Sequence, residues 1–264
     1  MRIWLHDRLV AVEAARIDPA DRGLLLGDGV FETLRVAGGR IAHAGRHLAR
    51  LQSAAAFFDI PCPDDATLTA AMEAVRAAEG IVQGTLRLTL TRGPAPRGLL
   101  PPARPRPTLL IRGVAAPPPP TEPVSLHIAA GTRRNAASPL SRFKTLNYLD
   151  NIIALREARM AGCDDALLLN TDGRLAEASA SNLLWRDRDG AWFTPPVSDG
   201  ALPGIRRGLL VEAGLVTERS LADPDAIAAA LLSNSNGLRH VGTLGGRLLQ
   251  TDDGALVRFR EATD

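Results

Sequence analysis

Apolar and polar residues alternate over short stretches in the first part of the chain, which is the spacing of strands with one buried face. Thr85–Thr91 shows this alternation most clearly. Helical spacing runs through Gly45–Phe58, and Asp65–Ala78 opens with an aspartate suited to an N-cap and continues in strong helix formers. The other strands predicted in this part are Ile3–Leu5, Arg8–Val12, Val30–Val36, Arg40–Ala42 and Thr108–Arg112.

The second part mixes the two spacings without internal repeats, and the whole pattern therefore predicts an α+β fold. A run of four prolines, 117–120, fits neither a helix interior nor a central strand. We therefore expect an N-terminal domain over 1–114, a proline-rich linker over 115–123 and a C-terminal domain over 124–264. The elements predicted in the second part are the strands Val124–Ala129, Asp165–Leu169 and Asn182–Trp185 and the helices Tyr148–Ala161, Ile205–Glu212 and Pro224–Ala230.

Composition narrows the class of protein. The 264 residues carry a net charge of +2 with basic residues spread along the chain, which favours neither nucleic-acid binding nor a polybasic membrane anchor. Cys62 and Cys163 follow no metal-ligand spacing, the five histidines form no spaced set, and no metal site is expected. Charges within the first ten residues argue against a signal peptide, and no apolar run reaches the roughly 18–20 residues of a membrane span. We expect a cytoplasmic protein.

Lys144 is the only lysine in the chain, and Glu177 follows it 33 residues later. A lysine amine can form a Schiff base and a carboxylate can keep a pyridine nitrogen protonated, which together are the minimum that pyridoxal phosphate (PLP) needs from a protein. Arginine could not replace this lysine, because a guanidinium stays charged. The spacing alone does not identify such a pair, so the surrounding residues matter.

Several blocks around these residues resemble those of the class IV aminotransferases, the fold type IV PLP enzymes. They run in family order from about Asp21 to Val241 and read DRGLLLGDGVFETLRV, RHLARL, KTLNYLDN, DDALLLNTDGRLAEASASNLLW, ALPGIRR and LLSNSNGLRHV. The resemblance implies a two-domain enzyme with a small N-terminal α/β domain and a larger C-terminal barrel-like α/β domain. It also implies that PLP lies between the two domains and that the protein is a homodimer in which one N-terminal domain reaches the neighbouring site.

The resemblance assigns roles to individual residues. Lys144 is expected to form the Schiff base and act as the catalytic base, and Glu177 to contact the pyridine nitrogen. The phosphate is expected at a helix N-terminus, where free N–H groups favour anions, although Arg206 stands where the family has a threonine. Tyr148 either lies near the cofactor or packs in its helix. The residues expected to bind the cofactor are Arg50, Lys144, Tyr148, Glu177, Gly204, Ile205, Arg206, Asn234 and Ser235.

Substrate recognition is ambiguous in the sequence. Arg97 stands where an RGxxxR block has its carboxylate-binding arginine, and a guanidinium can bind a carboxylate with two hydrogen bonds. D-amino acid transaminases have a tyrosine in place of Phe31 and a histidine in place of Leu99. Phe31, Thr33 and Asn234 are more similar to the lyases of the family, whereas KTLNYLDN is more similar to the transaminases. The residues expected to bind substrate are therefore Phe31, Thr33, Arg97 and Asn234.

Two activities follow from this resemblance. The first is a transaminase that moves an amino group between a primary amine or amino acid, of the D- or branched-chain type, and a 2-oxo acid acceptor. The second is 4-amino-4-deoxychorismate lyase, which forms 4-aminobenzoate and pyruvate. Both begin with Lys144 removing the proton from the substrate's Cα, and the sequence leaves the choice open.

Overall fold

The computed structural model describes residues 1–118 and 120–264, so that Pro119 of the expected linker lies outside the described residues. The chain divides into two compact units, Met1–Pro118 with Lys144–Asn147, and Pro119–Phe143 with Tyr148–Asp264. Within the described residues no helix is long and apolar enough to cross a membrane.

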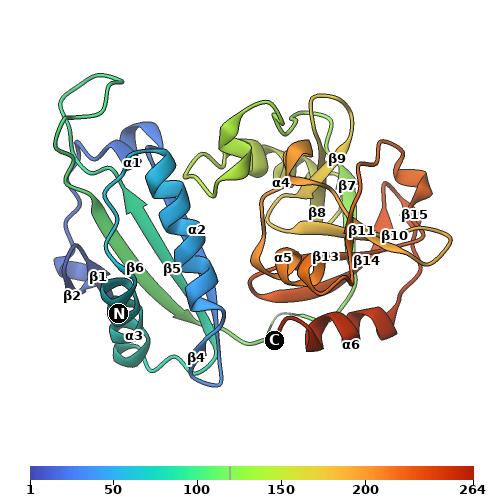
Figure 1. The fold of residues 1–264 in the computed structure, drawn as a ribbon, viewed down its shortest axis with the longest axis horizontal. Coiled ribbons are helices and arrows are strands. Elements are labelled where there is room, and N and C mark those ends of the chain that lie inside the picture. Colours follow the sequence, from blue (N-terminus) through green and yellow to red (C-terminus); the bar gives the residue numbers. More distant parts are fainter. Residues whose placement is uncertain (119) are drawn as a thin grey trace. The chain divides into compact units, whose positions relative to one another are not determined.

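The first unit is built on a sheet of six strands in the order β2-β1-β6-β5-β3-β4, with every neighbouring pair antiparallel. Two helices, α2 (Ala44–Phe57) and α3 (Asp65–Ala78), cover one face of this sheet (Figure 1). The strands are β1 (Arg2–Leu5), β2 (Arg8–Ala11), β3 (Gly29–Ala37), β4 (Arg40–Ile41), β5 (Gly84–Thr91) and β6 (Thr108–Ala115). A short helix, α1 (Arg22–Leu26), precedes β3 and was not expected from the sequence.

Alternation decides which face of this sheet meets the helices. Leu34 of β3, Leu88 of β5 and Ile111 of β6 are fully buried, while the residues between them along each strand point to the opposite face. The N-cap of α3 is Asp64 and not Asp65, the aspartate expected from the sequence. The side chain of Asp64 accepts the hydrogen bond from Thr67 N at 2.8 Å, so Asp65 is already the first residue of the helix.

The segment Lys144–Asn147 belongs with the first unit, although it falls inside the expected domain 124–264. Phe31 N donates to the carbonyl of Lys144 at 2.9 Å, and Leu146 N donates to the carbonyl of Gly29 at 3.0 Å. The segment therefore adds an extended edge beside the start of β3. This pairing links residues more than 100 positions apart, which a spacing pattern does not encode.

The second unit contains a closed barrel. Its ring runs β10-β13-β14-β7-β8-β9 and closes where β9 pairs with β10, while β11, β12 and β15 extend it. The ring strands are β7 (Val124–Ile128), β8 (Asp165–Leu169), β9 (Leu175–Ala178), β10 (Asn182–Arg186), β13 (Ala229–Asn234) and β14 (Gly237–Leu244), and the others are β11 (Trp192–Thr194), β12 (Thr217–Glu218) and β15 (Arg247–Leu248). The fold is therefore α+β with a barrel-like sheet, as expected.

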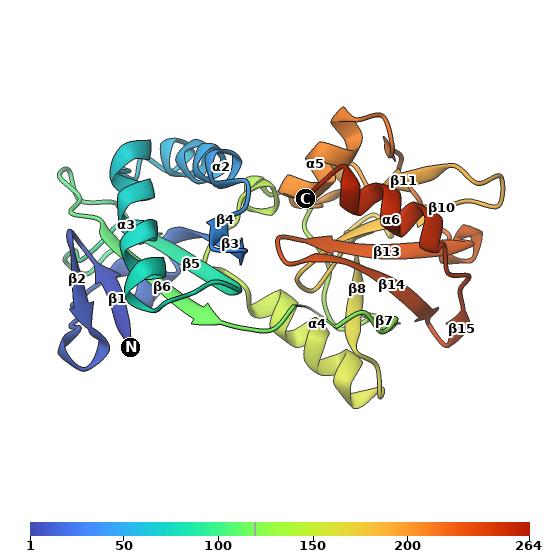
Figure 2. The ribbon, with the colours of Figure 1, turned by 90° about the horizontal axis from the view of Figure 1, so that it is seen from below.

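Three helices lie outside the barrel, α4 (Leu149–Met160), α5 (Ile205–Glu212) and α6 (Asp253–Glu261). Leu210 of α5 and Phe259 of α6 share one buried cluster with Leu231 of β13. Figure 2 shows the two helices on the same side of β13 and β14. The inner cluster contains Trp185 and residues of all six ring strands. Residues of the two clusters alternate along β10 and β13, so this part of the barrel wall has an inner and an outer apolar face.

The predicted helix Pro224–Ala230 is wrong. Pro224–Ala226 form a single 3-10 turn, and the chain then enters β13. Ala229 and Ala230 pair with Arg186 and Trp185 of β10 and are 1% exposed. Alanine favours a helix by local propensity, but its small side chain also fits the crowded barrel wall, and tertiary packing overrides the propensity.

The helix α4 buries small and polar residues and exposes large apolar ones. Its buried face presents Asn151, Ala154 and Ala158 to the barrel, while Ile152 and Ile153 are 58% and 48% exposed. Asn151 Nδ2 donates to the carbonyl of Ser179 at 2.8 Å, so this helix is fixed to the turn between β9 and β10. Small side chains allow the close approach that this contact requires.

Candidate active site

Lys144 lies in the first unit, and its position is set by the pairing with β3. Its Nζ lies 4.4 Å from the centroid of the Phe31 ring, within the range of a cation–π contact when the amine is protonated. Phe31 is 5% exposed, and the hydrogen bond of its N–H to the Lys144 carbonyl joins the two residues through the backbone as well. The structure thus brings together two of the residues predicted from the sequence.

Arg87 is a functional candidate that the sequence reasoning missed. Its Cζ lies 3.7 Å from the centroid of the same Phe31 ring. On the sheet it pairs with Thr33 of β3 on one side and with Arg112 of β6 on the other. The alternation of Thr85–Thr91 was the available signal, because it places Arg87 on the face opposite the buried leucines. Two arginines directly opposite each other repel, and a bound anion relieves that repulsion.

Glu177 lies on β9 in the second unit and is 6% exposed. Its Oε2 accepts from Leu202 N at 2.9 Å, and the Nδ2 of Asn182 lies 3.4 Å from the same oxygen. Arg134 Nη2 lies 3.2 Å from Oε1. These donors together surround both oxygens of the Glu177 carboxyl group. Arg134 was not foreseen.

Asn182 connects Glu177 with the start of α5. It lies opposite Glu177 in the pairing of β9 with β10, and its Nδ2 also donates to the carbonyl of Leu202 at 2.8 Å. A Cβ added at Gly204 would overlap the Oδ1 of Asn182, so only glycine allows this approach. Gly204 is the N-cap of α5 and supplies no capping side chain. The first N–H groups of α5, that of Ile205 included, form the kind of helix terminus that binds phosphate.

The turn between β13 and β14 is connected with the turn between β9 and β10. Asn234 Nδ2 donates to Ser181 Oγ at 2.9 Å, which joins that turn to the one between β9 and β10. Ser233 pairs with Asn182 across the two strands and therefore shares its face. The Ser233 Oγ is buried and makes no hydrogen bond within residues 1–118 and 120–264. A buried hydroxyl with no protein partner is suited to a ligand, whereas Ser235 is partly buried in the turn.

Arg206 does not point to solvent. It is 3% exposed, and its Nη1 donates to the carbonyl and to the Oγ1 of Thr263, both at 2.7 Å, and lies 2.8 Å from Asp264 Oδ1. The guanidinium is therefore directed to the end of α6. Arg206 contributes its backbone to the first turn of α5, while its side chain contacts residues that follow α6.

Arg50 lies on α2 of the first unit in a buried ionic group. Its Nε donates to Glu32 Oε1 at 2.7 Å and its Nη2 to Oε2 at 2.6 Å, and His47 Nδ1 lies 2.7 Å from Oε2. Burial raises the pKa of Glu32, but the hydrogen bonds from His47 and Arg50 lower it by a larger amount. The pKa of Glu32 therefore lies below its ordinary value. The group fixes the plane of the Arg50 guanidinium.

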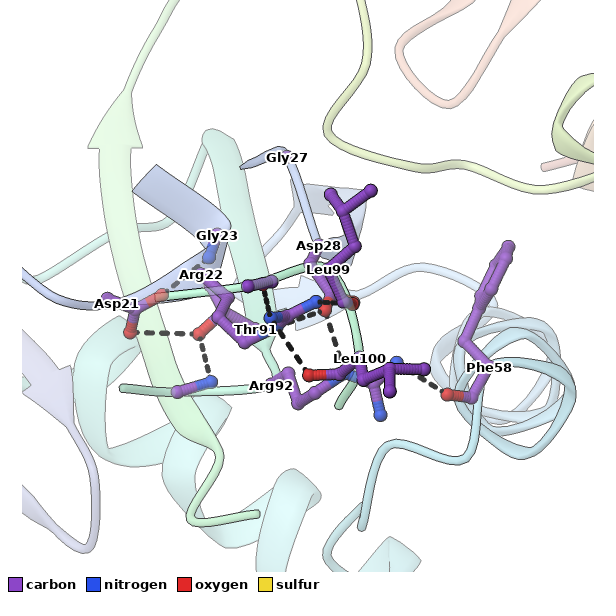
Figure 3. A network of polar contacts seen from close by, with 12 residues as sticks. Asp21, Arg22, Gly23, Gly27, Asp28, Phe58, Thr91, Arg92, Leu99 and Leu100 are labelled. Carbon is purple, nitrogen blue, oxygen red and sulfur yellow. Dashed lines mark hydrogen bonds and ion pairs between the residues drawn. The ribbon is translucent and has the colours of Figure 1, made fainter. Parts of the chain in front are cut away.

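Arg97 lies on an exposed loop of the first unit, on the wall of a cavity of about 680 Å³ that Leu25 and Leu99 also line. The contact of Arg97 with a substrate carboxylate stays a prediction. The loop is nonetheless well anchored, because Arg22 Nη2 donates to the carbonyl of Leu99 at 2.8 Å (Figure 3).

A network of arginines and one aspartate underlies that anchor. Asp28 Oδ2 accepts from Arg22 Nε at 2.7 Å and from Arg92 Nε at 2.8 Å, and Arg92 Nη2 donates to the carbonyl of Phe58 at 2.7 Å (Figure 3). Burial raises the pKa of Asp28, but the two guanidiniums lower it below its ordinary value. The network ties the loop to the end of α2.

Tyr148 stands at the N-cap of α4, and its carbonyl accepts the first helical hydrogen bond, from Ile152 N at 3.0 Å. Its proposed contact with the cofactor stays a prediction. No group of His, Cys, Asp or Glu side chains suited to a metal ion occurs among the described residues.

Comparison with known proteins places this arrangement in a family. A sequence model of the class IV aminotransferases matches residues 29–243. The chain belongs to the class IV aminotransferases. Members of this family are PLP enzymes, and this protein is therefore an enzyme with PLP as its cofactor. Members act on amino and oxo acids, or cleave aminodeoxychorismate.

Relatives in this family have different activities. A Methanocaldococcus jannaschii protein, provisionally assigned as a branched-chain-amino-acid aminotransferase, is 32% identical over 215 residues, 80% of this chain and 74% of its own. The D-alanine aminotransferase of Listeria innocua is 30% identical over 215 residues, again 80% and 74% of the two chains. The crystal structure of 4-amino-4-deoxychorismate lyase from Pseudomonas aeruginosa is 30% identical, with a TM-score of 0.84 over 98% of this chain and 96% of the other.

The residues of this class IV chain fit the cofactor. The second unit offers a buried carboxylate at Glu177, a Ser233 hydroxyl with no partner in the described residues, and an uncapped helix terminus at Gly204. The first unit offers the single lysine. This set matches what PLP requires, namely an amine, a proton-holding carboxylate and donors for a phosphate.

Proposed function

We propose that the protein is a transaminase that moves an amino group from an anionic amino donor to a 2-oxo acid. The observation that carries the proposal is the cluster of Lys144, Phe31 and Arg87 in the first unit. A reactive amine and a guanidinium against one aromatic ring suit a substrate that has an amino group at one position and a carboxylate at another.

Each residue has a part in this reaction. When bound, PLP supplies an aldehyde that joins covalently to an amine and a ring that withdraws electrons from the substrate's Cα. Lys144 would bind the cofactor and, once displaced, would take the proton from the substrate's Cα and deliver it to the cofactor's aldehyde carbon instead of returning it to Cα. Glu177 maintains the proton on the ring nitrogen, and Arg87 binds the substrate carboxylate.

The phosphate requires further donors. We assign it to the first N–H groups of α5, that of Ile205 included, together with Ser235 and the buried Ser233 hydroxyl, while Gly204, whose own N–H donates to the Leu202 carbonyl at 2.8 Å, shapes the loop before the helix. Arg50, whose guanidinium plane is fixed by Glu32, supplies positive charge. Asn234 and Tyr148 stay in the proposed site, Asn234 toward both the cofactor and the substrate and Tyr148 toward the cofactor.

Aminodeoxychorismate lyase activity is the second candidate. Phe31 and Thr33 are the residues that favoured it in the sequence, and both lie beside Arg87 on one face of the sheet. The opposed arginines Arg87 and Arg112 suit a substrate with two carboxylates, which aminodeoxychorismate has. The lyase from Pseudomonas aeruginosa resembles the chain over nearly its full length.

One experiment separates the two activities. Purified protein loaded with PLP is mixed with single amino donors, including glutamate, aspartate, leucine and both enantiomers of alanine, without an acceptor. A transaminase releases one equivalent of 2-oxo acid and turns over only when a second 2-oxo acid is added. If no donor gives this half-reaction while aminodeoxychorismate yields pyruvate and 4-aminobenzoate, the lyase is the correct activity. Lys144→Ala is the control for both arms.

We further propose that the protein is a homodimer that associates through the first unit. Leu24 and Leu25 of α1 and Leu99 and Leu100 of the anchored loop are 62–88% exposed, and large exposed apolar patches mark interaction surfaces. Arg97 lies on the same loop, so that in a dimer it would serve the site of the partner copy.

Mixing two inactive variants tests this arrangement. Lys144→Ala and Arg97→Ala are each expected to be inactive alone. After they are unfolded and refolded together, mixed dimers contain one intact site and regain activity. Absence of any recovery, with mixed dimers present by mass spectrometry, would refute the shared site, and a monomer by light scattering would refute the dimer itself.

A further inference from the structure

The end of the chain makes an unusual contact with α5. The Arg206 side chain is 2% exposed and reaches residues 57 and 58 positions later in the sequence. Its Nη1 donates to two oxygens of Thr263 and pairs with the carboxylate of Asp264. Thr263 is 1% exposed, and its Oγ1 donates to the carbonyl of Phe259 at 2.8 Å. This group, here called the C-terminal clamp, consists of Arg206, Thr263 and Asp264.

The clamp holds the first turn of α5, whose N–H groups are the ones available to bind an anion. Arg206 is the second residue of α5, directly after Ile205, so the clamp restrains the first helical turn. The preceding loop is restrained at its other end, where Leu202 N donates to Glu177 and the Leu202 carbonyl accepts from Asn182. The segment from Leu202 to Arg206 is therefore fixed from two sides, by the barrel and by the end of α6.

We propose that Thr263 and Asp264 are positioning residues for phosphate binding at the N-terminus of α5. This inference rests on the proposed function, in which that terminus binds the cofactor's phosphate. Helix N–H groups bind an anion well only when several point at it together, and a small rotation of the first turn spoils that alignment. The clamp holds Arg206, the second residue of α5, and so keeps the first N–H groups of the helix in a fixed direction.

The clamp is also anchored to β11, through the buried last turn of α6. Phe259 is fully buried and makes an edge-to-face contact with Trp192, with centroids 5.2 Å apart, so the last turn of α6 is packed on the barrel. Thr263 follows that turn. The position of Arg206 is thus fixed through α6, which is packed on the second unit's sheet.

Conservative variants test the proposal. Thr263→Val keeps the shape of the side chain and removes the hydroxyl, and Asp264→Asn keeps the size and removes the charge at a side chain that is 51% exposed. The dissociation constants of PLP and of pyridoxal, which lacks the phosphate, are measured by fluorescence on apoenzyme. We expect the double variant to bind PLP about tenfold more weakly, the order expected for losing a hydrogen bond to a charged group. Its affinity for pyridoxal is expected to stay the same.

Asp252→Asn is the matched control. Asp252 pairs with Arg186 at 3.0 Å at the opposite end of α6, and asparagine still caps that helix. It loses one ion pair of the same helix without touching α5, so PLP affinity is expected to be unchanged. A general loosening of α6 would instead weaken PLP in the control as well.

The outcomes separate the two proposals. If the wild-type protein binds PLP more tightly than pyridoxal but the double variant shows the same preference, the positioning role is wrong and the proposed function stands. An equal loss for PLP and pyridoxal also overturns the positioning role, because the effect would then be structural. If the wild-type protein binds neither compound, the proposed function itself fails.

Discussion

Replacing Glu32 with glutamine should destabilise the first unit strongly. Glu32 is 1% exposed and accepts three hydrogen bonds, two from Arg50 and one from His47. An amide of the same size presents NH₂ hydrogens where an acceptor is needed and removes the negative charge. Removing one partner of a buried ion pair costs about 3–5 kcal/mol, because the other partner stays buried without compensation. Arg50 is 13% exposed at its side chain, which places the expected loss at about 3 kcal/mol.

The measurement is urea denaturation combined with hydrogen exchange of the peptides that cover β3 and α2. Glu73→Gln is the matched control, since Glu73 pairs with Arg76 at 2.6 Å in the same unit, but the two side chains are 44% and 26% exposed. An exposed pair contributes about 0.5 kcal/mol. If Glu32→Gln costs no more than Glu73→Gln, burial does not set the strength of this group, and the argument is refuted. The fixed orientation of Arg50 also predicts weaker PLP binding in Glu32→Gln.

Three further predictions concern catalysis, the cofactor site and pH. Lys144→Arg should lower turnover by several orders of magnitude, as Lys144→Ala does, with an unchanged circular dichroism spectrum, because a guanidinium does not release its proton; appreciable turnover in either variant would exclude Lys144 as the base. Gly204→Ala should cost about 1–3 kcal/mol in thermal unfolding and weaken PLP binding, because the new methyl group displaces Asn182; wild-type values for both would contradict the close approach. Hydrogen bonds from the N–H groups of residues 130 and 131, and from a histidine, lower the pKa of Glu157 from 4.5 to about 2. Its folded pKa lies below its unfolded one, so its contribution is complete above about pH 4.5 and disappears as the pH falls to about 2. The stability difference between wild type and Glu157→Gln should therefore shrink over this range, and a constant difference would refute the assignment.

Much of the fold follows from local spacing. The alternation in Thr85–Thr91 and the helical spacing in Asp65–Ala78 both correspond to observed elements, because each reports only which side of its own segment is buried. The same reasoning failed at Ala229 and Ala230, whose alanines read as helix but lie in a barrel strand. Propensity is a weak local preference, and the neighbours in the barrel decided the outcome.

The sequence by itself determined the chemistry. Blocks of residues that resemble those of the class IV aminotransferases predicted a PLP enzyme, with the single lysine, Lys144, as the amine and Glu177 as the carboxylate. Only the tertiary structure decided what surrounds them. It directed Arg206 to Thr263, placed Arg134 against Glu177 and set Arg87 on the ring of Phe31. Partners of this kind are brought together by packing and strand register, and no pattern within either segment encodes which distant side chain a guanidinium will meet.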